Sequence, residues 1–81
     1  MLFDRILPAE AVTSALRITL IERRQVLIEQ HRGILGYTRD KVTVRLTEGY
    51  LYVVGQALEI SSYTSEDLCV SGHINRLEFQ P

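Results

Sequence analysis

The chain has 81 residues and a formal net charge of −1, with apolar residues at 46% and charged residues at 23%. A chain of this length forms one domain that buries only about 60% of its unfolded surface, and this composition is too apolar for a disordered tail. Because 9 Lys and Arg residues are scattered among 10 Asp and Glu residues, no basic stripe is available for nucleic-acid phosphates, and we expect no nucleic-acid partner.

Residues 1–15 predict a short amphipathic arm. Leu2, Phe3, Ile6 and Leu7 fall at helical spacing ahead of Pro8. Two interpretations are open: the arm docks on a membrane surface or a partner, or it is a flap over the core or a frayed end. No apolar run approaches the roughly 20 residues that span a bilayer, and the N-terminus lacks the features of a signal peptide. We therefore expect a cytosolic protein.

From Leu16 onward, apolar residues recur with a period of two, which indicates strands with one buried face. Ile18 and Leu20 alternate with polar residues, and so do Val26 and Ile28. The polar quartet "ERRQ" between these two runs has the length of a hairpin loop. The two runs predict an antiparallel pair.

The stretch "KVTVRLTEGYLYVVG" predicts a second hairpin. Gly49 supplies the positive φ that its loop requires. In the run that follows, Tyr50, Tyr52 and Val54 alternate with two aliphatic residues, so both faces are apolar. We expect this run to be a central strand, or its tyrosine face to be covered by another part of the structure. The runs "LEI", "DLCVSG" and "INRLEF" predict further short strands, with "SSYTSE" as a polar loop.

A weak internal repeat links these runs. Each unit has two apolar residues two positions apart, a turn-tolerant position and a further apolar residue, so it indicates a strand, a kink and a strand. The units are Leu51, Val53, Gly55 and Ile60; Leu68, Val70, Gly72 and Leu77; and Val26, Ile28, Gln30 and Leu35. For residues 16–81 we predict an all-β domain of six to eight short, mainly antiparallel strands. A roll or sandwich is favoured over a small β-solenoid because the spacing of the units is unequal.

Candidate reactive residues are few. His31 and His73 each follow the turn-tolerant position of a unit, and with Cys69 and one carboxylate they are conceivable metal ligands. The spacing matches no ligand motif, and Cys69 should face away from its buried neighbours, so hydrogen-bonded imidazoles at strand bends are favoured. The chain has no nucleophile elbow and no glycine-rich oxyanion loop. We expect no catalytic residue, metal, cofactor or small-molecule substrate.

The stretch "EQHRG" predicts a structural bend. Glu29, His31 and Arg32 can hydrogen-bond within the bend before Gly33 and so fix the backbone where one strand turns into the next.

From about Pro8 to Phe79 the sequence resembles the YabP/YqfC family of small sporulation proteins of endospore-forming Firmicutes. The most specific pieces are "IEQHRGILGYTRDKVTV", "GYLYVVGQALEI" and "LCVSGHINRLEF". Two departures are Glu22, where the family usually has glycine in the first hairpin, and Gly36, where it usually has an acidic residue. The resemblance implies a protein of mid-to-late spore development that is made in the mother cell, has no known catalytic activity and is encoded beside an integral membrane protein.

Two functions are compatible with these observations. The first is a scaffold or assembly module, cytoplasmic in the mother cell and peripheral at the membrane around the forespore. It would form a homo-oligomer through an exposed edge strand or the Tyr50, Tyr52 and Val54 face, and it would bind an integral membrane sporulation protein through residues 1–16. The second is a binding domain for a small lipid or envelope-related ligand that uses the same face as a groove, although 81 residues leave little room for a pocket.

Overall fold

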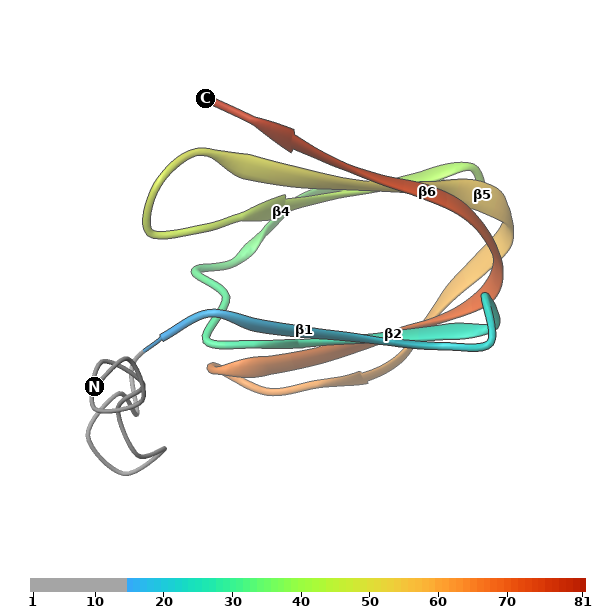
Figure 1. Cartoon of the computed structure of the whole chain (residues 1–81), viewed down its shortest axis with the longest axis horizontal. Helices are drawn as coiled ribbons and strands as arrows, with labels where there is room; N and C mark the ends of the chain where they lie inside the picture. The colour runs from blue at the N-terminus through green and yellow to red at the C-terminus, as the bar shows by residue number, and fades with distance from the viewer. Residues whose placement is uncertain (1–14) are drawn as a thin grey trace, which may run out of the picture.

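The alternation of apolar and polar residues produces six strands in the computed structural model, which describes residues 15–81 (Figure 1). Every pairing is antiparallel, in the order β1-β2-β6-β5-β4-β3. The predicted all-β class is confirmed. The strands are β1 (Arg17–Ile21), β2 (Gln25–Glu29), β3 (Ile34–Tyr37), β4 (Lys41–Arg45), β5 (Tyr50–Tyr63) and β6 (Asp67–Gln80).

The β5–β6 hairpin is longer than predicted, because each of its strands has 14 residues. The predicted polar loop is shorter than expected, since β5 continues to Tyr63 before the chain turns. Short strands were expected because Gly55 and Gly72 interrupt the apolar runs. These glycines bend the two strands without ending them.

The bend lies in the middle of this hairpin. In β5 the pairing register shifts on both sides of Gln56, and Ala57 has a φ of 53°. In β6, Gly72 has a φ of 138°, and a Cβ atom there would lie 2.6 Å from the Ala57 carbonyl oxygen. The neighbouring turns brace the bend, because Gly72 N–H donates to the Arg24 carbonyl and Gly55 N–H to the Asp40 carbonyl.

The bend folds the sheet back on itself into a two-layered roll (Figure 1). One layer contains β1, β2 and the loop-side half of the β5–β6 hairpin, and the other contains β3, β4 and the remaining half. The chain crosses between the layers at the two bent strands and at the connection between β2 and β3, where Gln30 has a φ of 70°. These are the kink positions of the internal repeat, and the structure confirms the roll.

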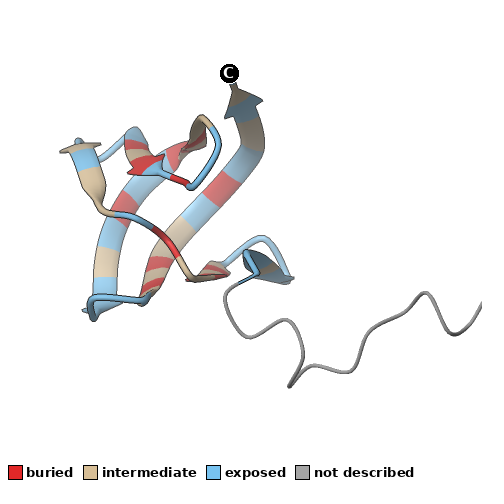
Figure 2. Ribbon diagram, turned by 90° about the vertical axis from the view of Figure 1, so that its left-hand side faces the viewer, coloured by how far each residue is buried: buried red, intermediate tan, exposed pale blue. Residues whose placement is uncertain are grey.

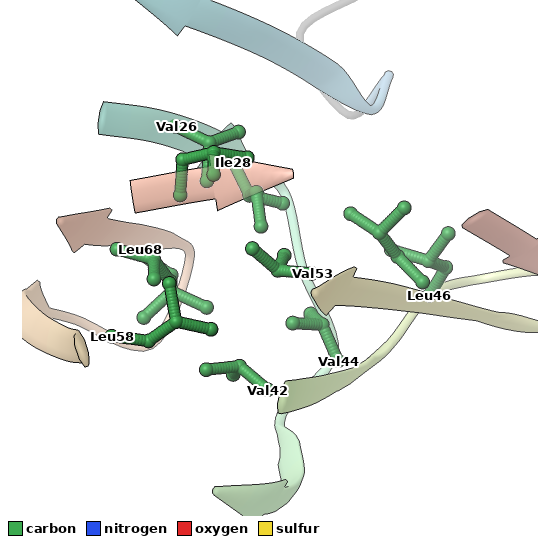
Figure 3. Packing of buried hydrophobic residues seen from close by; sticks show 11 residues of the cluster. Val26, Ile28, Val42, Val44, Leu46, Val53, Leu58 and Leu68 are labelled. Carbon is green, nitrogen blue, oxygen red and sulfur yellow. The ribbon is translucent and has the colours of Figure 1, made fainter. Parts of the chain in front are cut away.

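The core lies between the two layers (Figure 3). Along β2, β4 and the first parts of β5 and β6, buried residues alternate with exposed or half-buried ones, as the bands of Figure 2 show. The end strands β1 and β3 contain no buried residue. Every core side chain is aliphatic, and no aromatic residue among residues 15–81 belongs to the core. Its members are Val26, Ile28, Val42, Val44, Leu46, Leu51, Val53, Leu58, Leu68, Val70 and Ile74.

Both predicted hairpin turns are confirmed. The β1–β2 turn places Glu22 at a φ of 49° and Arg23 at 58°, and Arg24 N–H closes it on the Ile21 carbonyl at 2.8 Å. Glu22 therefore occupies a left-handed position, the conformation that glycine adopts most easily. Gly49 has a φ of 80° in the β4–β5 turn.

The predicted arm residues Leu2, Phe3, Ile6 and Leu7 lie outside the described residues. Within residues 15–81, no helix has the length and apolarity needed to cross a lipid bilayer.

Candidate functional site

His31 is the buried polar residue at the β2–β3 crossing, with 2% of its surface exposed. Its Nδ1 accepts a hydrogen bond from Gly33 N–H at 2.9 Å, and its Nε2 lies 2.9 Å from the Thr64 carbonyl oxygen. Because Nδ1 must present a lone pair to an N–H group, the proton resides on Nε2, which donates to the Thr64 carbonyl. The two contacts select one neutral tautomer.

The His31 ring joins two connections that are far apart in the sequence. It stacks on Tyr63 with the ring centroids 5.3 Å apart and the planes at 29°. The backbone N–H groups of Gln30 and His31 both donate to the Glu66 carbonyl, at 2.6 and 3.1 Å. The β2–β3 crossing is therefore clamped to the β5–β6 loop, and both ring nitrogens serve this contact.

The other residues of the predicted bend contact different elements. Arg32 N–H donates to the Arg45 carbonyl, and Arg45 N–H donates to the Gly33 carbonyl, both at 2.7 Å. These bonds hold the crossing against the end of β4, where Arg32 Nε also donates to Thr47 Oγ1 at 3.1 Å. Glu29 instead faces β1, with Oε1 3.9 Å from Arg17 Nε. His31, Arg32 and Gly33 thus brace one crossing, and Glu29 lies beside it.

The residues considered as metal ligands differ in burial and lie in different parts of the fold. His73 is exposed on the bend of β6, whereas His31 is buried. Cys69 is half-buried and alternates with buried Leu68 and Val70, which confirms its predicted orientation. Within residues 15–81, the structure contains no cluster of three or more His, Cys, Asp or Glu side chains placed to hold a metal ion.

Tyr50, Tyr52 and Val54 lie on the outer face of β5 and are half-buried, opposite the buried residues of the same strand. As predicted, this strand is central, because β4 and β6 flank it. We call these three residues the tyrosine face. Lys41 Nζ lies 4.4 Å from the Tyr52 ring centroid, a cation–π contact. On β6, Glu78 pairs in register with Tyr52 and forms an ion pair at 3.3 Å with its neighbour Arg76.

A groove of about 350 Å³ is lined by residues just before β1, by the β4–β5 turn and by the end of β6. These segments lie at the open end of the roll, away from the bend (Figure 1). Phe79, which is 62% exposed, forms one side, and Leu16 and Leu46 supply further apolar lining beside Ala15, Thr47 and Glu48. Phe79 is not among the candidate site residues that the sequence indicates. Its alternation with Leu77 matches that of a core residue, and no sequence signal shows that this end of β6 lacks a neighbour on its second side.

The comparisons with known proteins agree on one family. The sequence model of the YabP family matches residues 13–81. The uncharacterized protein YqfC of Bacillus subtilis (strain 168) is 26% identical over 73 residues, which cover 90% of this chain and 78% of the relative. No solved structure shows significant similarity. The family match includes all six strands, His31 and the tyrosine face.

Proposed function

The chain belongs to the YabP family, and we propose that it is a non-catalytic assembly module of endospore formation. Membership of the family indicates a sporulation-related protein. In this proposal the β roll forms a homo-oligomer and holds an integral membrane sporulation protein, and it transforms no substrate. It acts in the cytoplasm of the mother cell, at the membrane that surrounds the forespore.

The observation that carries the proposal is the tyrosine face. Two tyrosine side chains occupy the outer side of a central strand, where they contribute nothing to the aliphatic core. Charged residues of β4 and β6 surround them. An aromatic centre with a charged rim is the usual anatomy of a protein–protein interface, in which tyrosine is enriched and contributes a large share of the binding energy.

The arm offers a second contact to the same membrane. In this proposal Leu2, Phe3, Ile6 and Leu7 bind the membrane surface or the membrane partner, and the tyrosine face binds the cytoplasmic part of that partner. Membrane binding by an amphipathic segment scales with the apolar area that it buries, so a segment this short binds weakly and a second contact strengthens recruitment.

The state of His31 supports a role without catalysis. A general base needs a ring nitrogen within reach of a substrate proton, and both nitrogens of His31 are bonded inside the fold. The ring fixes the path of the backbone between the layers.

The test is Tyr52→Glu in the full chain, because a carboxylate at the centre of the face opposes an apolar contact without disturbing the core. We expect the variant to fold, by circular dichroism and thermal melting, and to fail to restore heat-resistant spores in a strain that lacks the gene. A photocrosslinking amino acid at position 52 should join the chain to an integral membrane protein in sporulating cells. Ser62→Glu, at an exposed position of β5, is the matched control. A folded Tyr52→Glu variant with a normal spore titre would contradict the proposal.

The groove at the open end favours a second candidate, a binding domain for a small lipid or envelope-related ligand. Its volume of about 350 Å³ is at the lower limit for a ligand pocket. If this function is correct, membrane lipid extracts raise the melting temperature of the wild-type chain but not that of Phe79→Ser. If the assembly function is correct, neither chain responds.

A further inference from the structure

The strands at the two ends of the sheet order, β1 and β3, differ in how well they are protected from pairing with another chain. Because the sheet is bent, the C-terminal half of β6 and the loop-side half of β5 also pair on one side only. The first carries the charged pair Arg76 and Glu78, and the second is interrupted by register shifts, both of which oppose edge pairing. At one end, β3 has only 4 residues, and its pairing with β4 is interrupted by a register shift between Ile34 and Gly36. The Tyr37 hydroxyl donates to the Leu58 carbonyl at 2.7 Å and ties this edge to the bend of β5. Short length and irregularity are devices by which proteins prevent edge strands from pairing with other chains.

At the other end, β1 is also short, but its pairing is regular. Its 5 residues, "RITLI", pair with β2 in a continuous register and contain no proline. Leu20 and Ile21 point to opposite faces, and each is 47% exposed. The one charged residue, Arg17, lies beside Glu29 of β2. Because an antiparallel partner engages only alternate residues, the remaining N–H and C=O groups of β1 are directed to its open side.

A further strand would satisfy the backbone N–H and C=O groups on the open side of β1. The sequence of β1 is self-complementary, so a second copy of β1 can supply that strand. In an antiparallel pair of two β1 strands with a two-fold axis at Thr19, each Ile18 lies opposite Leu20 of the second copy. Thr19 lies opposite Thr19, and Arg17 lies opposite Ile21. Aliphatic residues then meet on the face continuous with the core, and a Thr–Thr pair, which is favourable across strands, occupies the axis.

We propose that β1 is the homotypic interface of this protein, and that two copies join through it into one continuous antiparallel sheet. This inference rests on the proposed assembly function and supplies the surface for self-association. It leaves the tyrosine face of each copy free for the membrane partner, because that face is on β5. One dimer then presents two equivalent tyrosine faces to the membrane.

The size of the contact sets the expected affinity. A strand of 5 residues on each side is smaller than the roughly 800 Å² per partner of a standard stable interface. We therefore expect a weak dimer, with a dissociation constant in about the micromolar range or above. Its mass should rise with concentration from 9.3 kDa towards twice that value.

The two-fold axis provides the decisive experiment. Thr19 is exposed, so both Thr19→Lys and Thr19→Glu should fold. Each variant alone places like charges directly opposite one another and should weaken the dimer by about tenfold in sedimentation equilibrium. An equimolar mixture of the two places opposite charges at the axis and should recover the wild-type dissociation constant. Leu35→Lys puts the same charge on the opposite edge strand and should leave the dimer unchanged.

A second measurement does not depend on charge. In a Cys69→Ser background, which removes the chain's single cysteine, Thr19→Cys should form a covalent dimer on mild oxidation. Residues directly opposite in an antiparallel pair have Cα atoms about 4.5–5.5 Å apart, within the range that a disulfide accepts. Ser62→Cys in the same background should remain monomeric.

Three results would overturn the proposal: a wild-type chain that stays monomeric up to millimolar concentration, a Thr19→Lys dimer as tight as the wild type, or a charged mixture that gains nothing over its components. None of them bears on Tyr52→Glu. A monomeric chain whose Tyr52→Glu variant still loses spore formation would refute the β1 interface and leave the membrane-partner function standing.

Discussion

Replacing His31 removes the one buried polar side chain of the described fold, and the structure sets the size of the effect. His31→Ala loses two hydrogen bonds of 2.9 Å and leaves Gly33 N–H and the Thr64 carbonyl without their partner. Each bond contributes about 1 kcal/mol net, and a buried group left unpaired adds a desolvation cost of a similar size. Together with the lost stacking on Tyr63, we expect the free energy of unfolding to fall by about 2–4 kcal/mol.

Two further substitutions at position 31 distinguish the contributions of the two hydrogen bonds. His31→Asn retains an acceptor close to the position of Nδ1 and should keep the bond from Gly33 N–H. His31→Gln retains a donor at greater reach and should keep the bond to the Thr64 carbonyl. Each should cost about half as much as His31→Ala, because each loses one bond. Urea unfolding of the full chain measures all three, and about 1 kcal/mol should correspond to 4–8 °C in melting temperature for a domain of this size.

His73→Ala is the matched control, because His73 follows the kink of its repeat unit as His31 does but is exposed. It should change the free energy of unfolding by less than about 0.5 kcal/mol. Nitrogen chemical shifts of the two imidazoles should show His31 as the neutral Nε2–H tautomer. A His31→Ala variant as stable as the wild type, or a proton on Nδ1, would contradict the bracing role of His31.

The backbone geometry yields three further predictions. Gly72→Ala should lower the free energy of unfolding by about 3 kcal/mol in urea titrations, because a φ of 138° and a carbonyl oxygen 2.6 Å from the new Cβ both oppose the side chain. Glu22→Asn combined with Arg23→Gly should raise the melting temperature by a few degrees, since both residues are left-handed and Asn-Gly is preferred in such turns. Tyr37→Phe should cost about 1 kcal/mol of unfolding free energy in the same assay, because it loses a hydrogen bond of 2.7 Å to the bend of β5.

The period-two pattern identified the strands well because it reflects burial on one side of a sheet. Val42 and Val44 are fully buried, and the polar residues flanking them are not. The pattern does not distinguish a central strand from an edge strand. Leu20 alternates just as Val44 does, yet it is 47% exposed, because within residues 15–81 β1 pairs with β2 alone. Edges are set by the order of strands in the sheet, which depends on pairings distant in the sequence.

The bends could be predicted from local sequence, whereas the contacts of His31 could not. Gly55 and Gly72 stood at matching positions of the repeat, and both lie where the hairpin changes layer. The sequence therefore indicated the bends. The contact of His31 with the β5–β6 loop could not be predicted from the sequence. One of its hydrogen-bond partners, Gly33, is two residues away, but the other, Thr64, is 33 residues away. Only the first of these is within the reach of a local motif.

The placement of aromatic residues separates the two candidate functions. An aromatic side chain removes more apolar surface from water than any aliphatic one, so a domain this small gains most by burying it. Here the core is aliphatic, and the aromatic residues are distributed over distant places: the outer face of β5, the last residue of β5 beside His31, and Phe79 at the open end. A small-ligand site requires such side chains to converge on one cavity. Their spread over several surfaces favours contact with other proteins, and it predicts that single aromatic substitutions impair assembly more than they impair folding.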